Sequence, residues 1–274
     1  MNIIHPDSRP ATPLPRLHPR QIYGIIFAMK HLFLFVGLLA CGISAAKDYQ
    51  ENRVPAIGQN AQNIVTFDAT KKGPRVLYVG NSITLHGPRP SIGWTNNWGM
   101  AATALEKDYV HLLSTKIAAA QPEAQCCLLQ VADTFERSFY KPVWELEKNF
   151  KWAREFHPNV IILFFGANVP WEYDIKTLSP APARTFAAAM EEFIDYINPD
   201  KKAAVFISQG FYARTALDAE KETLAKKRGF NLIKLTDIRS IDEVHGLYNH
   251  TNDIGMALIA ERFWSAISPR IKAN

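Results

Sequence analysis

Short apolar runs alternate with segments of helical spacing along the chain from residue 75 onward. The runs cover residues 75–80, 126–131, 159–166, 203–208 and 230–235. Each is almost continuously apolar, which is typical of strands buried on both faces of a parallel sheet; strands with one wet face alternate between apolar and polar. We therefore predict five core strands.

The segments between these runs carry apolar residues every three to four positions, as amphipathic helices do. They cover residues 108–120, 144–152, 184–197, 213–228 and 253–271. Strands and helices in alternation predict an α/β fold, a three-layer α/β/α sandwich with a mainly parallel five-stranded sheet and right-handed crossovers.

The first 74 residues do not follow this alternation and divide into three parts. Residues 1–28 are rich in proline without a clear period, and we interpret them as an extension that precedes a natural start at Met29. Residues 29–46 carry a basic start, a short apolar stretch and small residues, which is typical of a secretory signal peptide. Residues 47–74 form a lead-in, with an extra strand over 63–69 as one reading, to the domain expected over 75–274.

Alternatives stay open for the exported form. Residues 38–41 (LLAC) resemble a bacterial lipobox, in which Cys41 would carry a lipid anchor, whereas cleavage near Ala45 or Ala46 would release a protein without a lipid. A signal anchor with residues 1–28 as a cytoplasmic arm is a third reading, although the apolar stretch is short for a membrane span. We expect a secreted or periplasmic protein, with a membrane contact only through Cys41.

Composition narrows the classes of partner and cofactor. The formal net charge is +5, but the basic residues are scattered and form no stripe, so we expect no nucleic-acid partner. Cys126 and Cys127 are neighbours in a predicted strand and would point to opposite faces as buried free thiols. The sequence contains no metal-ligand spacing and no glycine-rich nucleotide loop, so we expect no metal and no cofactor.

Polar residues with complementary chemistry follow the first and third apolar runs and precede the last helix. They are Ser82, Asn168 and His250. Functional residues of parallel α/β sheets gather at the carboxyl ends of the strands. A hydroxyl, an amide and an imidazole that meet there would serve as nucleophile, oxyanion donor and base. Each residue alone is more simply explained as a turn serine, a loop amide or a surface histidine.

The sequences around these three residues resemble motif blocks of the SGNH (GDSL-type) hydrolases. GNSIT at 80–84 resembles the first block, whose serine is the nucleophile, and FFGAN at 164–168 resembles the Gly-x-Asn of the third. HTNDIGMALIAERFW at 250–264 resembles the fifth, His-Pro-Asn-x-x-Gly followed by a helix. The order of the blocks agrees over residues 75–274. The insert after the first block resembles a subgroup of secreted bacterial SGNH proteins, many of them regarded as carbohydrate esterases.

The resemblance implies an ester hydrolase. Ser82 would attack the ester carbonyl after His250 takes its proton, and the Ser82 backbone N–H and the Asn168 side chain would hold the oxyanion. The second block usually adds a glycine N–H to this oxyanion hole. Here the segment QVADTFERSF contains no glycine, and Ala132 or Asp133 stands near that place.

The fifth block departs from the family pattern in the residue that would orient the base. The family has an aspartate three residues before the histidine, and this chain has Leu247 there. His245 does have Asp242 three residues before it. The asparagine and glycine that follow the family histidine nevertheless match His250, which we therefore prefer as the base.

Another group must then orient His250. A backbone carbonyl could fix the imidazole tautomer, and a remote acid such as Glu243 is the alternative. We interpret Asp253 as the N-cap of the last helix rather than as a catalytic acid.

Loop aromatic residues suggest the substrate. We predict that Trp94, Trp98 and Trp171, with Asn81 beside the nucleophile, bind substrate. Aromatic rings of this kind suit sugar stacking and equally suit an apolar acyl pocket, and some of them would simply belong to the core. The subgroup resemblance implies acetyl esters of carbohydrates, on a small molecule or a polysaccharide. The alternatives are a lipid-directed esterase, lysophospholipase or thioesterase, and a catalytically decayed carbohydrate-binding protein.

Overall fold

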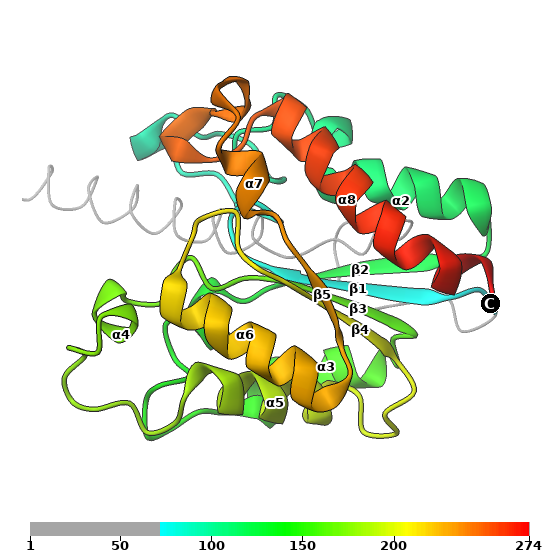
Figure 1. Ribbon diagram of the computed structural model, residues 1–274. Coiled ribbons are helices and arrows are strands. Elements are labelled where there is room, and N and C mark those ends of the chain that lie inside the picture. The colour runs from blue at the N-terminus through cyan, green and yellow to red at the C-terminus, as the bar shows by residue number, and fades with distance from the viewer. Residues whose placement is uncertain (1–71, 274) are drawn as a thin grey trace, which may run out of the picture. The chain divides into compact units, whose positions relative to one another are not determined.

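A five-stranded parallel sheet runs through the part of the chain that the structure describes, residues 72–273 of a computed structural model (Figure 1). Its strands are β1 (Arg75–Gly80), β2 (Gln125–Gln130), β3 (Val160–Phe164), β4 (Ala204–Ser208) and β5 (Asn231–Ile233), in the spatial order β2-β1-β3-β4-β5. All neighbouring pairs are parallel. The chain reverses its direction of winding between β1 and β3, which is where open α/β sheets bind ligands.

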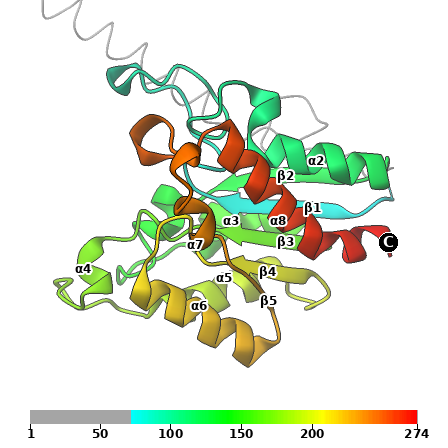
Figure 2. The same cartoon turned by 45° about the horizontal axis from the view of Figure 1, so that its top comes forward.

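Helices cover both faces of this sheet, as the strand–helix alternation predicts (Figures 1 and 2). One face carries α2 (Tyr109–Ala120) and α8 (Asp253–Lys272), and the other carries α3 (Leu146–Glu155), α5 (Phe186–Ile197) and α6 (Thr215–Arg228). The predicted three-layer α/β/α sandwich is confirmed.

The connections contain short helical turns. They are α4 (Trp171–Asp174), α7 (Thr236–Arg239), the 3₁₀ turns η1 (Pro90–Ile92), η2 (Leu105–Lys107), η4 (Asp242–Val244) and η5 (Leu247–Asn249), and a π-helical turn, η3 (Ala132–Glu136). Single π turns are frequently found at functional sites. Among the helices of residues 72–273, none combines the length and the apolar character that crossing a membrane requires.

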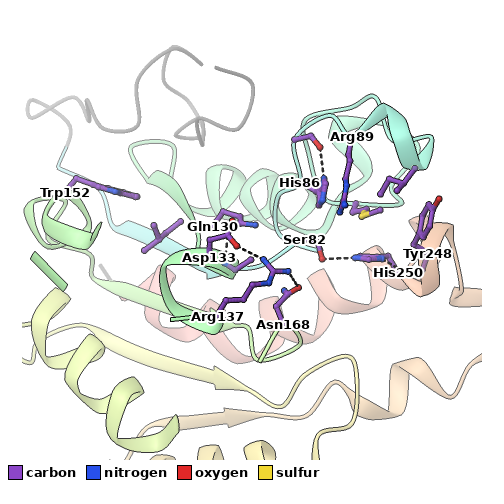
Figure 3. A pocket seen from close by; sticks show the side chains of 15 residues that line it. Ser82, His86, Arg89, Gln130, Asp133, Arg137, Trp152, Asn168, Tyr248 and His250 are labelled. Atoms are coloured by element: carbon purple, nitrogen blue, oxygen red, sulfur yellow. Dashed lines mark hydrogen bonds and ion pairs between the residues drawn. The ribbon is translucent and has the colours of Figure 1, made fainter. Parts of the chain in front are cut away.

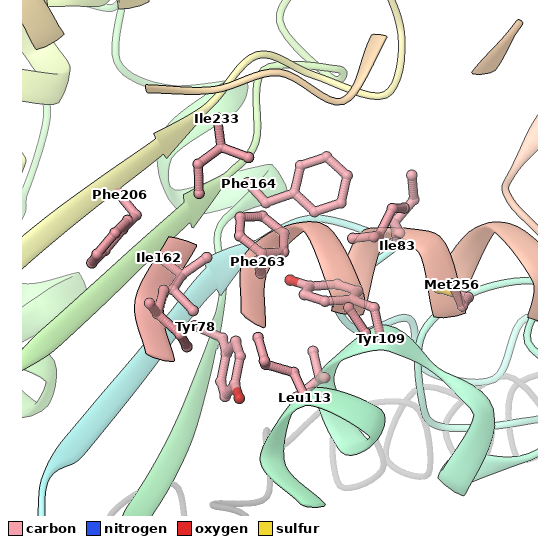
Figure 4. Close-up of a cluster of buried hydrophobic side chains, with 14 of the residues drawn as sticks. Tyr78, Ile83, Tyr109, Leu113, Ile162, Phe164, Phe206, Ile233, Met256 and Phe263 are labelled. Atoms are coloured by element: carbon pink, nitrogen blue, oxygen red, sulfur yellow. The ribbon is translucent and has the colours of Figure 1, made fainter. Parts of the chain in front are cut away.

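The sheet is buried on both faces, which explains why its strands are continuously apolar. Val76 and Tyr78 pack under α2 and α8, while Leu77 and Val79 pack under the helices of the opposite face. Figure 4 shows the first of these cores, in which Tyr109 of α2 meets Phe263 of α8 with ring centroids 5.7 Å apart.

The two cysteines divide between these cores as predicted. Cys126 lies in the core under α2 and α8, Cys127 lies in the opposite core, and both are buried free thiols. Burial raises the pKa of the Cys126 thiol to about 11 and that of Cys127 to about 12, so both are protonated at neutral pH.

The start of α8 corrects one prediction. Its N-cap is Asn252, whose side-chain oxygen accepts from the N–H groups of Ile254 (3.0 Å) and Gly255 (3.3 Å). Asp253 is the first residue of the helix, and its carboxylate instead accepts from the backbone and hydroxyl of Thr103 at 2.8 and 2.6 Å. The carboxylate therefore ties α8 to the insert after β1.

The strand considered over residues 63–69 and the signal segment lie outside the described residues.

Candidate active site

Ser82 stands in a tight turn at the carboxyl end of β1. The Asn81 carbonyl accepts from the N–H groups of Thr84 and Leu85, both at 2.9 Å, which closes the turn around the serine. Gly80 has no alternative here, because a Cβ at that position would lie 1.7 Å from the Thr84 hydroxyl oxygen. The half-buried Ser82 hydroxyl is therefore held at a defined place above the sheet.

The last connection brings His250 to this hydroxyl. Its Nε2 lies 2.7 Å from Ser82 Oγ (Figure 3). Its Nδ1 lies 2.9 Å from the backbone carbonyl oxygen of Tyr248. A carbonyl oxygen can only accept, so Nδ1 carries the proton and Nε2 presents a lone pair to the serine. This is the tautomer that can take the Ser82 proton.

The Tyr248 carbonyl reaches the imidazole because the backbone is folded unusually before it. Tyr248 and Asn249 both have left-handed conformations, with φ of +52° and +59°. That conformation is rare for a bulky residue such as tyrosine. The Tyr212 hydroxyl donates to the Asn249 carbonyl at 2.9 Å and supports the loop.

His245, the alternative base, and Glu243, the acid considered for orienting His250, take no part in these two contacts. The exposed ring of His245 packs at 6.5 Å from the Phe211 ring and does not line the cavity that contains Ser82. The backbone carbonyl of Glu243 accepts from the Asn252 side chain, and a carbonyl occupies Nδ1 of His250 in place of any acid.

Burial tunes His250 toward its neutral form. Desolvation lowers the pKa of His250 from its usual value, and the nearby His86 acts in the same direction. The bond from Nδ1 to the Tyr248 carbonyl opposes this shift only in part. An unprotonated imidazole beside the serine is thus the resting form at neutral pH.

Asn168 lies after β3, beyond a glycine with φ of +128°. Its side-chain Nδ2 donates to Glu136 Oε2 at 2.7 Å, and its Oδ1 accepts from the Arg137 guanidinium at 2.7 Å. Both ends of the amide are therefore fixed, and Nδ2 keeps one further hydrogen.

Glu136 organises this half of the site, and the sequence did not single it out. The fully buried carboxylate accepts from Asn81 Nδ2 (3.0 Å), from the backbone N–H groups of Gly166 and Asn168, and from Asn168 Nδ2. It links the ends of β1, β2 and β3. A buried charge is costly unless donors surround it, and here they do. No local pattern around Glu136 signals this role, because its donors come from distant segments, those of Asn81, Gly166 and Asn168.

The candidate oxyanion donors differ in availability. No acceptor for the Ser82 backbone N–H occurs among the described residues. The Ala132 N–H, in contrast, donates to the Gln130 side-chain oxygen at 3.0 Å. The structure therefore brings Ala132 to the cavity wall with its N–H already bonded.

An open cavity of about 610 Å³ contains the Ser82–His250 pair (Figure 3). Its wall includes His86, Arg89, Gln130, Asp133, Arg137, Asn168, Trp152 and Tyr248. Among the described residues no cluster of three or more His, Cys, Asp or Glu could hold a metal ion.

The four predicted substrate-binding residues do not line this cavity. Trp94 is buried and donates to the His86 carbonyl, and Trp98 packs edge-on against it at 6.0 Å, so both form the core of the insert. Trp171 is 56% exposed and packs against the Arg214 guanidinium. Asn81 is buried against Glu136. These loop residues have packing partners of their own, which the sequence pattern does not reveal.

Comparison with known proteins places the fold. No family model matches the chain, and no curated protein matches it. A solved structure described as a GDSL-like lipase, from Parabacteroides merdae ATCC 43184, matches with a TM-score of 0.50 and 12% identity over 72% of this chain and 97% of that one. The chain has the SGNH hydrolase fold.

Other structures match the SGNH hydrolase fold of this chain more weakly. The acetyl xylan esterase AlAXEase has a TM-score of 0.47 and 16% identity, over 70% of this chain and 99% of that one. A two-domain esterase (CEX) active on acetylated mannans has a TM-score of 0.49 and 14% identity over 74% of this chain. The match covers 52% of that protein, so this chain spans about half its length.

Proposed function

We propose that this chain is a serine esterase of the SGNH hydrolase family that hydrolyses short acyl esters, acetyl esters foremost, on a carbohydrate. The observation that carries the proposal is the 2.7 Å contact of Ser82 Oγ with His250 Nε2, with Nδ1 held by the Tyr248 carbonyl, at the wall of an open cavity. The fold and the three motif blocks support the same chemistry.

The reaction would proceed in two steps. Ser82 attacks the acyl carbonyl while His250 takes its proton; His250 then returns this proton to the leaving alcohol, which leaves an acyl group on Ser82. Water activated by the same imidazole hydrolyses the acyl-enzyme and restores the serine. The Tyr248 carbonyl keeps His250 in the required tautomer and accepts from the imidazolium, in the place of the usual acid.

The oxyanion would be held by two donors, the free N–H of Ser82 and the remaining hydrogen of Asn168 Nδ2. Glu136 and Arg137 fix the Asn168 amide from both ends, so this donor is oriented before the reaction begins. Glu136 thus acts through Asn168 and does not itself touch the substrate.

The walls of the cavity support a short acyl group and a hydroxylated alcohol. Besides the apolar Ile92, Met100 and Leu129, the wall carries side chains with hydrogen-bonding groups, among them Gln130, Asn168 and Arg137. A long acyl chain would desolvate these groups without replacing their hydrogen bonds, at a cost of about 1–3 kcal/mol each. Tyr248 and Trp152, which line the cavity at opposite ends (Figure 3), are the aromatic side chains on which a sugar would stack.

Fluorophosphonate labelling of the full chain tests the proposed nucleophile. We expect labelling at Ser82, loss of labelling in Ser82→Ala, and retention in Ser91→Ala, which removes an exposed serine of the same insert. A panel of p-nitrophenyl acetate, butyrate and octanoate then tests the acyl length. A strong preference for octanoate would replace the short-acyl proposal with the lipid-directed one.

One observation favours a second candidate, a carbohydrate-binding protein without turnover. The Ala132 N–H, a predicted oxyanion donor, is bonded to the Gln130 side chain. Sugar binding without fluorophosphonate labelling of the wild type would support this candidate against the esterase.

Export of the protein is a further part of the proposal. The sequence of residues 29–46 supports a signal peptide, and Cys41 supports a lipid anchor as the alternative. Sequencing the N-terminus of the mature protein distinguishes cleavage near Ala45 from a lipidated Cys41.

A further inference from the structure

Arg89 brings a charged group to the cavity from a well-braced loop. Its backbone exchanges two hydrogen bonds with Trp94, at 2.7 and 3.3 Å, and the Trp94 indole donates to the His86 carbonyl at 2.9 Å. In Figure 3 the side chain extends from this loop toward the cavity, beside His86 and on the same side as Ser82. The backbone of Arg89 is thus fixed, while its guanidinium group faces the cavity that contains Ser82.

The Arg89 guanidinium has no ion-pair or hydrogen-bond partner among residues 72–273. The second guanidinium of the cavity wall differs in this respect. Arg137 pairs with Asp133 at 2.7 Å and also donates to Asn168 at 2.7 Å. The Arg137 guanidinium therefore already has partners within the protein, whereas the Arg89 guanidinium is available to a ligand.

The other ionisable groups of the wall do not neutralise Arg89. Asp133 is matched by Arg137, and the carboxylate of Glu136 below the wall is surrounded by its own donors. The pKa of His86 is lowered by burial and by the adjacent arginines, and the pKa of His250 is lowered as well. Among the charged side chains that line the cavity, Arg89 is therefore the one without an ion-pair partner within residues 72–273.

We propose that Arg89 binds a carboxylate on the alcohol portion of the substrate, which makes the substrate an acidic acylated sugar such as an acetylated uronic acid. The inference rests on the proposed esterase function and deepens it. A guanidinium offers a planar fork that matches a carboxylate with two parallel hydrogen bonds. An acidic sugar would be both attracted and oriented with its ester toward Ser82.

A pair of aryl acetates isolates the effect of the carboxylate. The substrates are 3-carboxyphenyl acetate and the neutral 3-carbamoylphenyl acetate, compared by kcat/KM for the wild type, Arg89→Gln and Lys202→Gln. Lys202 is an exposed residue before β4 and controls for the loss of one positive charge. Fluorophosphonate labelling of each variant reports whether its Ser–His pair is intact.

We expect Arg89→Gln to reduce the carboxyl-to-carbamoyl ratio of kcat/KM about tenfold, while Lys202→Gln leaves the ratio at the wild-type value. Because Arg89 is exposed, the wild-type ratio should also fall as sodium chloride is raised. Acetylated methyl glucuronoside should then be preferred to acetylated methyl glucoside in the same Arg89-dependent way.

Three results would overturn the inference. One is an equal ratio in wild type and Arg89→Gln; another is an equal loss in Lys202→Gln. The third is an Arg89-dependent preference for p-nitrophenyl hemisuccinate over the butyrate, which would assign the carboxylate to the acyl portion. All three presuppose hydrolysis of aryl acetates by the wild type, so they differ from failure of the esterase proposal, in which no acetate is cleaved and Ser82 is not labelled.

Discussion

The two halves of the candidate site are built in opposite ways. Ser82 and His250 come from loops, are partly open to the cavity, and depend on one contact of 2.7 Å and one backbone carbonyl. The amide half centres on the fully buried Glu136, which ties three strand ends together and holds Asn168.

This difference follows from what each half would have to do. A nucleophile and a base exchange a proton and must remain accessible to substrate, so few other contacts can hold them. An oxyanion donor performs best when its dipole is fixed before charge develops. The buried carboxylate supplies that rigidity without facing the substrate. The mutations below separate the two halves by the size of their effects.

The largest effects are expected in the Ser–His half. Ser82→Ala and His250→Ala should each lower kcat for p-nitrophenyl acetate by at least about 10³-fold, because each removes a reacting group. His245→Ala is the matched control and should retain wild-type kcat. Loss of turnover in His245→Ala with retention in His250→Ala would reverse the assignment of the base.

The next largest effects are expected in the amide half. Asn168→Ala should lower kcat about 10²- to 10³-fold as an oxyanion donor is lost. Glu136→Gln should lower kcat less, about 10- to 100-fold. A glutamine side chain would point its own NH₂ group at one of the N–H groups that donate to Glu136 in the wild type, so one of these hydrogen bonds would be lost. The KM should change little in either variant, since an oxyanion donor acts mainly on the transition state.

A purely structural role for Glu136 would give a different pattern. Its substitution would then lower the melting temperature while kcat per labelled active site stayed at the wild-type value. Glu145→Gln, which removes an exposed carboxylate that pairs with Lys148 at 2.9 Å, is the matched control for the loss of charge.

Arg137→Gln should have a smaller effect than Glu136→Gln. It frees the Asn168 oxygen but leaves the Nδ2 bond to Glu136, so we expect a threefold to tenfold loss of kcat, equivalent to one hydrogen bond of about 1 kcal/mol. Arg262→Gln, which breaks an exposed pair with Asp237 at 2.8 Å, should not change kcat. A loss in Arg137→Gln as large as that in Asn168→Ala would mean that the arginine itself contacts the substrate.

The same comparison explains how far the sequence could predict this protein. The spacing of apolar residues within a strand or a helix is a local property of the sequence. It was enough to predict the sheet, the helical layers on its two faces and the burial of the two cysteines. Ser82, Asn168 and His250 were recognisable because each follows or precedes an element at a position that parallel sheets use for function. The structure brings the first and third into contact, while their catalytic roles stay predictions.

The errors have a common physical cause. The donors to Glu136 lie 30 to 55 residues away from it along the chain, so its role depends on tertiary packing that no local pattern carries. Trp94 and Trp98 were predicted to meet substrate, yet they pack against each other. A loop aromatic residue and a buried loop-core residue look alike in sequence, because both stand among glycine, proline and asparagine.

The smallest expected effect is on the pH dependence, and it tests what replaces the missing acid. His250 must be neutral to act as a base, and burial lowers its pKa from the usual 6.5. The fraction of active enzyme should therefore fall only as the pH drops through a midpoint below 6.5. Leu247→Asp places a carboxylate three residues before His250, and a carboxylate favours the imidazolium, so the midpoint of kcat/KM, which reports the free enzyme, should move to higher pH. Ile241→Asp, at an exposed residue of the same connection, is the control and should leave the midpoint unchanged.

A wild-type midpoint above 6.5 would mean that an acid already faces His250, and that the Tyr248 carbonyl is not its partner during turnover.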